Sequence, residues 1–199
     1  MEVTATLTDL LDEIWGSLQY GAAEEQATFH TPVLGTCDKD GCHLRTVVLR
    51  RVQPEARAII CHTDIRSGKV AEIQRNPAVS WLFYSPNQKI QVRAEGSATV
   101  HHLDEIAQEA WRDSPLSSRL NYVANLAPGT RTDRPESGWP EYRLYRMPTE
   151  EESMAGWPNF SVVVSTITRL DWLNLDDSGH RRARFEWTGN NFNGTWIIP

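Results

Sequence analysis

The stretch that decides the fold is R-T-V-V-L-R-R at Arg45–Arg51, in which branched apolar residues lie between arginines. The apolar run is typical of a buried strand. A strand that only fills a core needs no guanidinium groups at its ends, so the arginines are either solvated or hold an anion. Arg45 and Arg50 have opposite parity and point to opposite faces of a regular strand. They can hold one extended ligand only if the strand bends or bulges.

Composition excludes several classes of protein. The chain has 199 residues, a formal net charge of -6, 40% hydrophobic and 23% charged residues. This length can bury one sizeable core, so we expect a single domain over residues 1–199. The negative net charge disfavours binding to nucleic acid or to an anionic membrane surface. No stretch reads as a membrane span or a leader, so we expect no membrane association.

The cysteine content favours a reducing compartment. Cys37, Cys42 and Cys61 are too few for a secreted disulfide framework and lack paired metal-binding spacing. We therefore expect a cytoplasmic protein with no metal site. Cys37 and Cys42 flank a turn, where they are either a disulfide or, as we favour, two half-buried thiols.

Outward from Arg45–Arg51, the pattern predicts a mainly antiparallel β domain. Residues 29–37 and 42–52 read as a hairpin around the turn Asp38–Gly41. Residues 89–100 alternate between an apolar and a polar face. Further strands are expected over 58–62, 79–84, 160–172, 180–188 and 194–199. About seven strands joined largely by hairpins favour a small antiparallel barrel with flanking helices, which segment 160–199 completes.

Helices are expected at the N-terminus and between strands. Residues 1–21 contain an amphipathic helix with Thr6 or Thr8 as N-cap and Gly21 as its stop. Segments 67–75, 103–112 and 117–123 also read as helical. Residues 127–148 are rich in Pro, Gly, Arg and Glu and predict a long loop insertion.

Motifs of self-contained catalysis are absent from the sequence. There is no G-x-S-x-G, H-E-x-x-H or G-x-x-x-x-G-K-[ST]. His101 and His102 are adjacent in a strand and point to opposite faces, so one metal ion does not take both. We therefore name no catalytic side chain.

The segment R-S-G-K at 66–69 is a candidate phosphate site. Lys69 and the amides near Ser67 lie at the first turn of a predicted helix, where the dipole favours an anion. Arg45 could reach the same place, since a guanidinium group pairs with phosphate oxygens. The same pattern also occurs in plain helix capping, so residues alone leave both interpretations open.

The order of four motifs resembles the pyridoxamine 5'-phosphate oxidase family of FMN-binding split barrels. They are R-T-V-V-L-R, H-T-D-I-R-S-G-K-V-A-E-I, N-P-A-V-S-W-L-F-Y and Q-V-R-A-E-G-S-A. The resemblance implies a six-stranded antiparallel split β-barrel with flanking helices. It also implies a homodimer with FMN bound at the dimer interface and a small-molecule substrate.

Matched position by position, the resemblance implies a set of flavin-binding residues. They are Arg45, Thr46, Val47, Val48, Leu49, Arg50, His62, Thr63, Arg66, Ser67, Lys69, Gln91, Ser117, Ser118, Trp172 and Arg184. Arg50 and Arg182 are the candidates for the anionic group of a substrate. Ser117 and Ser118 would reach the phosphate from the partner subunit.

Departures from the family pattern concern the substrate more than the flavin. Gly68 replaces an arginine of the phosphate motif, so Arg66 would have to take its place. His180-Arg181-Arg182 replaces the family's Arg-x-His, which would grip the vitamin phosphate. We therefore expect an FMN-dependent oxidoreductase that is related to the vitamin oxidase, and the sequence does not identify it as that enzyme. The alternatives are a non-catalytic or regulatory FMN-binding module, an FMN reductase with a nicotinamide donor, and an unrelated small barrel.

Overall fold

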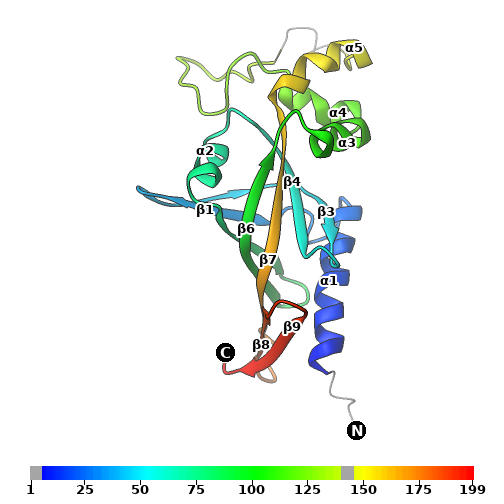
Figure 1. Ribbon diagram of the computed structural model, residues 1–199, viewed down its shortest axis with the longest axis vertical. Coiled ribbons are helices and arrows are strands. Elements are labelled where there is room, and N and C mark those ends of the chain that lie inside the picture. The colour runs from blue at the N-terminus through cyan, green and yellow to red at the C-terminus, as the bar shows by residue number, and fades with distance from the viewer. Residues whose placement is uncertain (1–5, 140–145) are drawn as a thin grey trace.

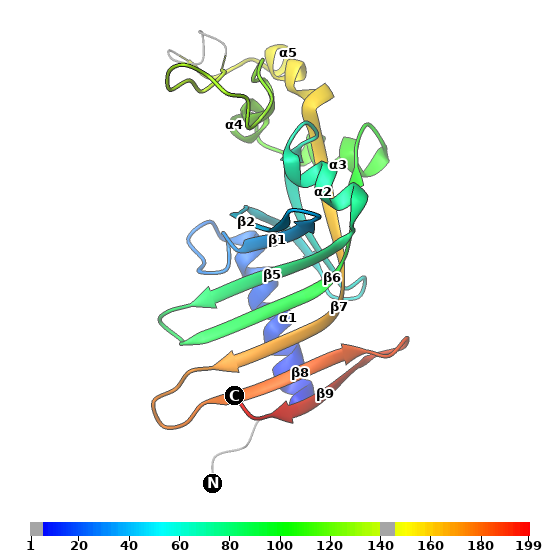
Figure 2. The ribbon, with the colours of Figure 1, turned by 90° about the vertical axis from the view of Figure 1, so that its left-hand side faces the viewer.

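The computed structural model describes residues 6–139 and 146–199 (Figure 1, Figure 2). The mainly antiparallel β class with flanking helices is confirmed, but the described residues form nine strands, so the expected number of six was wrong. The stretch Arg45–Arg51 is divided between two strands, and a C-terminal hairpin over residues 181–197 extends the sheet. The strands are β1 Val33–Asp38, β2 Gly41–Thr46, β3 Leu49–Gln53, β4 Ala58–Asp64, β5 Ala78–Ser85, β6 Ile90–His101, β7 Phe160–Asn174, β8 Arg181–Trp187 and β9 Phe192–Ile197.

The stretch Arg45–Arg51 forms the seam of the sheet. The strand order is β2-β1-β5-β6-β7-β4-β3, which puts the consecutive strands β2 and β3 at opposite ends of the path. From Thr46 to Leu49 the chain can span only about 10 Å, so the sheet must curl until its ends meet. The register of β3 against β4 shifts between Leu49 and Arg51, which leaves Arg50 in a bulge. This bulge supplies the bend that the two arginines require.

The long strands β6 and β7 connect two parts of the sheet. β7 pairs with β4 through residues 160–166 and with β8 through residues 169–174, while β6 accompanies it along its length. Figure 2 shows β7 running from beside the upper helices down into the lower sheet. The β6 register shifts between Glu95 and Gly96, where a Cβ on Gly96 would lie 2.0 Å from the carbonyl oxygen of Thr166. The strands therefore approach this closely only because the residue is glycine.

The N-terminal helix α1, Leu7–Ala23, follows one side of the sheet (Figure 1). Thr6 is its N-cap, and Thr6 and Asp9 form a reciprocal capping box. The helix continues two residues past Gly21, the expected stop. Its buried face, which includes Leu18, packs into the main core together with side chains of the sheet. The largest fully buried members of this core are Trp81, Phe83, Phe185, Leu18, Leu34, Leu49, Ile59, Ile167 and Leu170.

The other helices lie between strands or beside the upper end of β7. They are α2 Gly68–Arg75, α3 Glu105–Asp113, α4 Leu116–Arg119, η1 Leu120–Tyr122, α5 Glu150–Ser153 and η3 Met154–Asn159. A second core cluster forms there around Trp111, Tyr122 and Phe160. Of the expected loop 127–148, residues 127–139 and 146–148 contain no helix or strand, and 140–145 lie outside the described residues. Every helix among the described residues is too short or too polar to cross a lipid bilayer.

Candidate functional site

A half-buried lysine without an acidic partner among the described residues lies at the junction of β4 and α2. Lys69 Nζ donates to Thr63 Oγ1 at 2.8 Å and to Ser67 Oγ at 3.2 Å. Burial lowers the pKa of Lys69, and the nearby charge of Arg45 acts in the same direction. Among residues 6–139 and 146–199, Lys69 forms no ion pair. A half-buried ammonium group that is bonded to hydroxyls alone favours an anion beside it.

The start of α2 adds backbone donors to this lysine. Ser67 is the N-cap, but its side chain forms no capping hydrogen bond. The first N–H groups of a helix have no partner within the helix, and its dipole is positive at this end. Lys69 and these amides therefore form a group that suits a phosphate. We name Thr63, Ser67 and Lys69 the lysine group.

Arg45 lies near the lysine group but is held by another contact. Its Nη1 donates to Thr36 Oγ1 at 2.6 Å, and its Nη2 lies 2.9 Å from Glu72 Oε2. Thr36 also donates to the same carboxylate oxygen. Burial raises the pKa of Glu72, but the hydrogen bonds from Thr36 and Arg45 outweigh it, so the pKa is lowered. Arg45 is therefore oriented from β2 toward α2 by an acid that the sequence analysis did not identify.

Arg50 and His62 line a small cavity of about 210 Å³ beside α3. Within the part of the chain that the structure describes, Arg50 makes no hydrogen bond or ion pair. Burial lowers the pKa of His62 to about 3, and the charges of Arg50 and Arg51 act in the same direction. The His62 ring packs edge-on against Phe160, with ring centroids 4.9 Å apart. The cavity therefore combines an unpaired cation with a histidine that stays neutral at ordinary pH.

Arg66 does not lie with the lysine group. Its Nε and Nη2 donate to the two carboxylate oxygens of Asp64 at 3.0 Å and 2.7 Å, and Nη2 also donates to the carbonyl of Ala124 at 3.0 Å. Asp64 and the loop after η1 thus hold the guanidinium group. In this arrangement Arg66 does not take the place of the arginine that Gly68 lacks.

Three further predicted residues lie at the opposite end of β6 and β7. Gln91 is paired with Leu173, and Trp172 packs edge-on against Trp196, with ring centroids 6.4 Å apart. Arg184 follows on β8, opposite Asp171. Trp172 and Arg182 line a second cavity of about 480 Å³ near the C-terminus.

Asp171 gathers three arginines at this end. Its carboxylate contacts Arg182 and Arg93, each at 3.0 Å, and Arg184 at 3.5 Å. Burial raises the pKa of Asp171, but the hydrogen bond from Arg182 and the charge of Arg93 outweigh it, so the pKa is lowered. Three guanidinium groups face one carboxylate, so this arginine group keeps an excess of positive charge.

The remaining predicted residues contribute unequally. Thr46 is exposed, Val47 and Val48 are half-buried, and the Leu49 side chain is fully buried in the main core. The side chain of Leu49 therefore serves packing, and only its backbone lies at the seam. Ser117 is exposed and Ser118 half-buried, both in α4.

One copy of the chain does not bring the predicted residues together. His62 is paired with Val162, and Trp172 lies ten residues further along β7. At about 3.3 Å per residue, Trp172 lies about 30 Å along β7 from Val162, and Val162 is at the end of the sheet that carries the lysine group. The structure thus assembles Arg45, Arg50, His62 and the lysine group at one end. Gln91, Trp172, Arg182 and Arg184 lie at the other end.

Comparison with known proteins finds one matching family model and several solved structures with a similar fold. Residues 12–102 match the family model described as pyridoxamine 5'-phosphate oxidase, FMN-binding domain. The chain is similar to a crystal structure of a pyridoxamine 5'-phosphate oxidase-related FMN-binding protein from Nostoc punctiforme. The identity is 21%, the TM-score is 0.75, and the match covers 98% of this chain and 100% of that one.

Two more structures share the fold. PhzG from Burkholderia lata, solved with tetrahydrophenazine-1-carboxylic acid, is 16% identical with a TM-score of 0.69, over 100% of this chain and 95% of that one. A protein related to general stress protein 26 from Clostridium acetobutylicum is 10% identical with a TM-score of 0.54, over 87% and 92%. These likenesses confirm the split-barrel class of the fold.

Proposed function

We propose that the protein is an FMN-dependent oxidoreductase acting on a small molecule, because residues 12–102 match the FMN-binding domain model of the pyridoxamine 5'-phosphate oxidase family. The observation that carries the proposal is the lysine group. Its ammonium donates to two hydroxyls and has no acidic partner among the described residues. A ligand phosphate is the partner that this arrangement favours.

The residues present fit the phosphate of FMN. A phosphate ester offers three acceptor oxygens, which match Lys69 Nζ and the first N–H groups of α2. Arg45 is near enough for its charge to lower the pKa of Lys69. It can exchange part of its contact with Glu72 for a phosphate oxygen. Arg66 is not required for this arrangement.

The chain's own residues would bind and orient the flavin and the substrate, and they would exclude water. When bound, FMN would supply hydride or electron transfer, which accounts for the absence of an acid–base motif in the sequence. His62, held neutral by burial, would line the flavin without adding charge. Arg50, whose guanidinium group has no partner within the described residues, would hold an anionic group of the substrate.

We also propose that the active form is a homodimer. Gln91, Trp172 and Arg184 lie about 30 Å along the strands from the lysine group, too far to share one flavin with it in a single copy. The Nε atoms of Arg93 and Arg184 are buried and have no hydrogen bond among the described residues. Donors of this kind suit a ligand or a second subunit.

A non-catalytic FMN-binding module is the second candidate. The observation that favours it is the pairing of Arg182, the expected substrate residue, with Asp171 through two hydrogen bonds. A guanidinium group engaged in this way has fewer donors left for a substrate.

Flavin uptake and anaerobic reduction test both candidates. The purified protein should bind FMN, seen as quenching of flavin fluorescence, and the bound flavin should bleach with one of the donors tried. These are pyridoxamine 5'-phosphate, pyridoxine 5'-phosphate and reduced nicotinamides. Bleaching by a nicotinamide alone would identify a reductase, and FMN uptake without bleaching by any donor would favour the non-catalytic module. A chain that binds no FMN would overturn both.

A further inference from the structure

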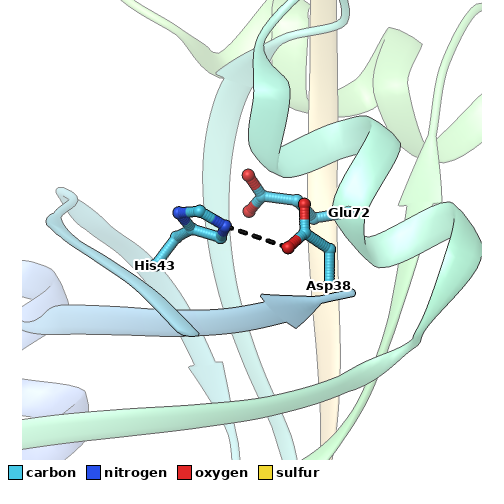
Figure 3. A group of neighbouring side chains, drawn as sticks. All are labelled: Asp38, His43 and Glu72. Atoms are coloured by element: carbon cyan, nitrogen blue, oxygen red, sulfur yellow. Dashed lines mark hydrogen bonds and ion pairs between the residues drawn. The ribbon is translucent and has the colours of Figure 1, made fainter. Parts of the chain in front are cut away.

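Three side chains of metal-ligating type converge at the tip of the first hairpin. Asp38 ends β1, His43 lies in β2, and Glu72 projects from α2 toward them (Figure 3). One donor atom from each lies within 4.8 Å of the other two, and all three residues are half-buried. His43 Nε2 lies 3.1 Å from Asp38 Oδ1. Because Glu72 is 29 residues beyond His43, no local spacing in the sequence reveals this group, and we expected no metal site.

Neighbouring groups already fix the two carboxylates. Asp38 Oδ1 accepts the backbone N–H of Asp40 at 2.8 Å. Glu72 Oε2 accepts from Thr36 and Arg45, which leaves its Oε1 without a hydrogen bond among the described residues. Carboxylates that bind a metal through one oxygen are commonly held through the other in this way. The group thus has both its donors and the contacts that orient them.

The charges of the group favour a cation. Asp38 and Glu72 bring two carboxylates close together, and Arg45 is the one residue of fixed positive charge in ion-pair contact with either among the described residues. With a neutral His43 imidazole, the carboxylates outnumber that cation by one. A divalent ion between the three donors would remove the repulsion of the carboxylates.

We propose that His43 Nε2, the Asp38 carboxylate and Glu72 Oε1 bind a divalent first-row transition metal ion, with Zn²⁺ as the best match. One imidazole and two carboxylates, with water in the fourth position, suit Zn²⁺. Bonds of about 2.0 to 2.2 Å put donor atoms about 3.3 Å apart, so donor atoms that lie within 4.8 Å of one another must approach by about 1.5 Å at most. His43 then carries its proton on Nδ1. This site does not depend on the proposed flavin chemistry.

Metal titration of the full chain tests the proposal. After dialysis against a chelator, Zn²⁺ is titrated by calorimetry and Co²⁺ by its visible absorption. We expect one equivalent of metal per chain and a Co²⁺ spectrum of low coordination number. His43→Gln should weaken binding more than about 100-fold, because loss of a ligand exceeds the 10- to 100-fold effect of outer contacts. His180→Gln, which changes an exposed histidine just before β8, should bind as the wild type does.

A second variant separates ligation from folding. Asp38→Asn keeps the shape of the side chain and should also weaken Zn²⁺ binding, and circular dichroism shows whether both variants fold. Absence of a stoichiometric site in the wild type would overturn the proposal. Binding that neither His43→Gln nor Asp38→Asn weakens would overturn it as well.

Discussion

Asp171 accepts two parallel hydrogen bonds from Arg182, with Nε on Oδ1 and Nη2 on Oδ2, each at 3.0 Å. The Asp171 side chain is 3% exposed, and Arg93 contacts the same carboxylate from the neighbouring strand. A bidentate contact of this kind fixes the plane of both groups. Asp171 therefore joins β6, β7 and β8 through charge as well as through the backbone.

Removal of this carboxylate should destabilise the protein. In Asp171→Ala three guanidinium groups lose their shared partner, and because they are partly exposed we expect a loss of about 2 to 4 kcal/mol in the free energy of unfolding. Urea denaturation measures this loss. Asp177→Ala is the matched control, since Asp177 is 90% exposed and pairs with Lys89 at the surface. A loss no larger than that of the control would show that the arginines resolvate freely.

Lys69 should dominate the affinity for FMN. Lys69→Ala removes a charge-assisted hydrogen bond to phosphate, worth about 1.5 to 3 kcal/mol, so the Kd should rise about ten- to a hundredfold. Flavin fluorescence titration measures it. Lys39→Ala is the control, because the Lys39 side chain is 83% exposed and pairs with Asp40 in the hairpin turn. Equal affinity in the two variants would refute the phosphate role of the lysine group.

Two glycines should respond in opposite directions to alanine. Gly96→Ala forces a methyl group against the Thr166 carbonyl, so we expect a loss of about 2 kcal/mol or more in unfolding free energy. Gly16→Ala meets nothing within 4 Å in α1, and better helix propensity should stabilise by about 0.5 to 1 kcal/mol. Thermal and urea unfolding of both variants measure the difference. A small loss of unfolding free energy in Gly96→Ala would mean that β6 and β7 separate easily at their register shift.

His62 should make the protein less stable in mild acid. Its folded pKa is about 3, below the unfolded value near 6.5, so the unfolded chain binds the extra proton and stability falls as the pH drops below about 6.5. Between about pH 7.5 and pH 5 this amounts to about 2 kcal/mol. His62→Gln should lose that part of the pH dependence, measured by urea denaturation without flavin. His180→Gln should retain it, and identical profiles for His62→Gln and the wild type would exclude a buried neutral His62.

Strands and the lysine group could be predicted from the sequence because their signals are local. The alternation over 89–100 predicted β6, since one face of that strand is buried. Thr63, Ser67 and Lys69 lie within one strand-to-helix junction, so their proximity follows from chain connectivity. The turns of η3 were not predicted, because so short a helix shows no repeat and Pro158 lies inside it.

Residues that depend on distant partners were missed. Glu72 meets Arg45 across 27 positions, and Asp171 meets Arg93 across a pair of strands that are joined by a long connection. A carboxylate in a strand reads as an exposed polar residue until its partners are known. The contact of Arg66 with the Ala124 carbonyl likewise joins distant positions, so the sequence does not reveal that this carbonyl and Asp64 hold its guanidinium group.

The pairing of β4 with β7 has a consequence for how the chain folds. It joins residues about a hundred positions apart, such as Ala58 with Thr166, so its contact order is high and its loop closure slow. During synthesis one edge of β4 and one edge of β6 have no strand beside them until β7 has emerged. These open edges are the places where a nascent chain would pair with another copy, so the last fifth of the chain completes the protection against aggregation.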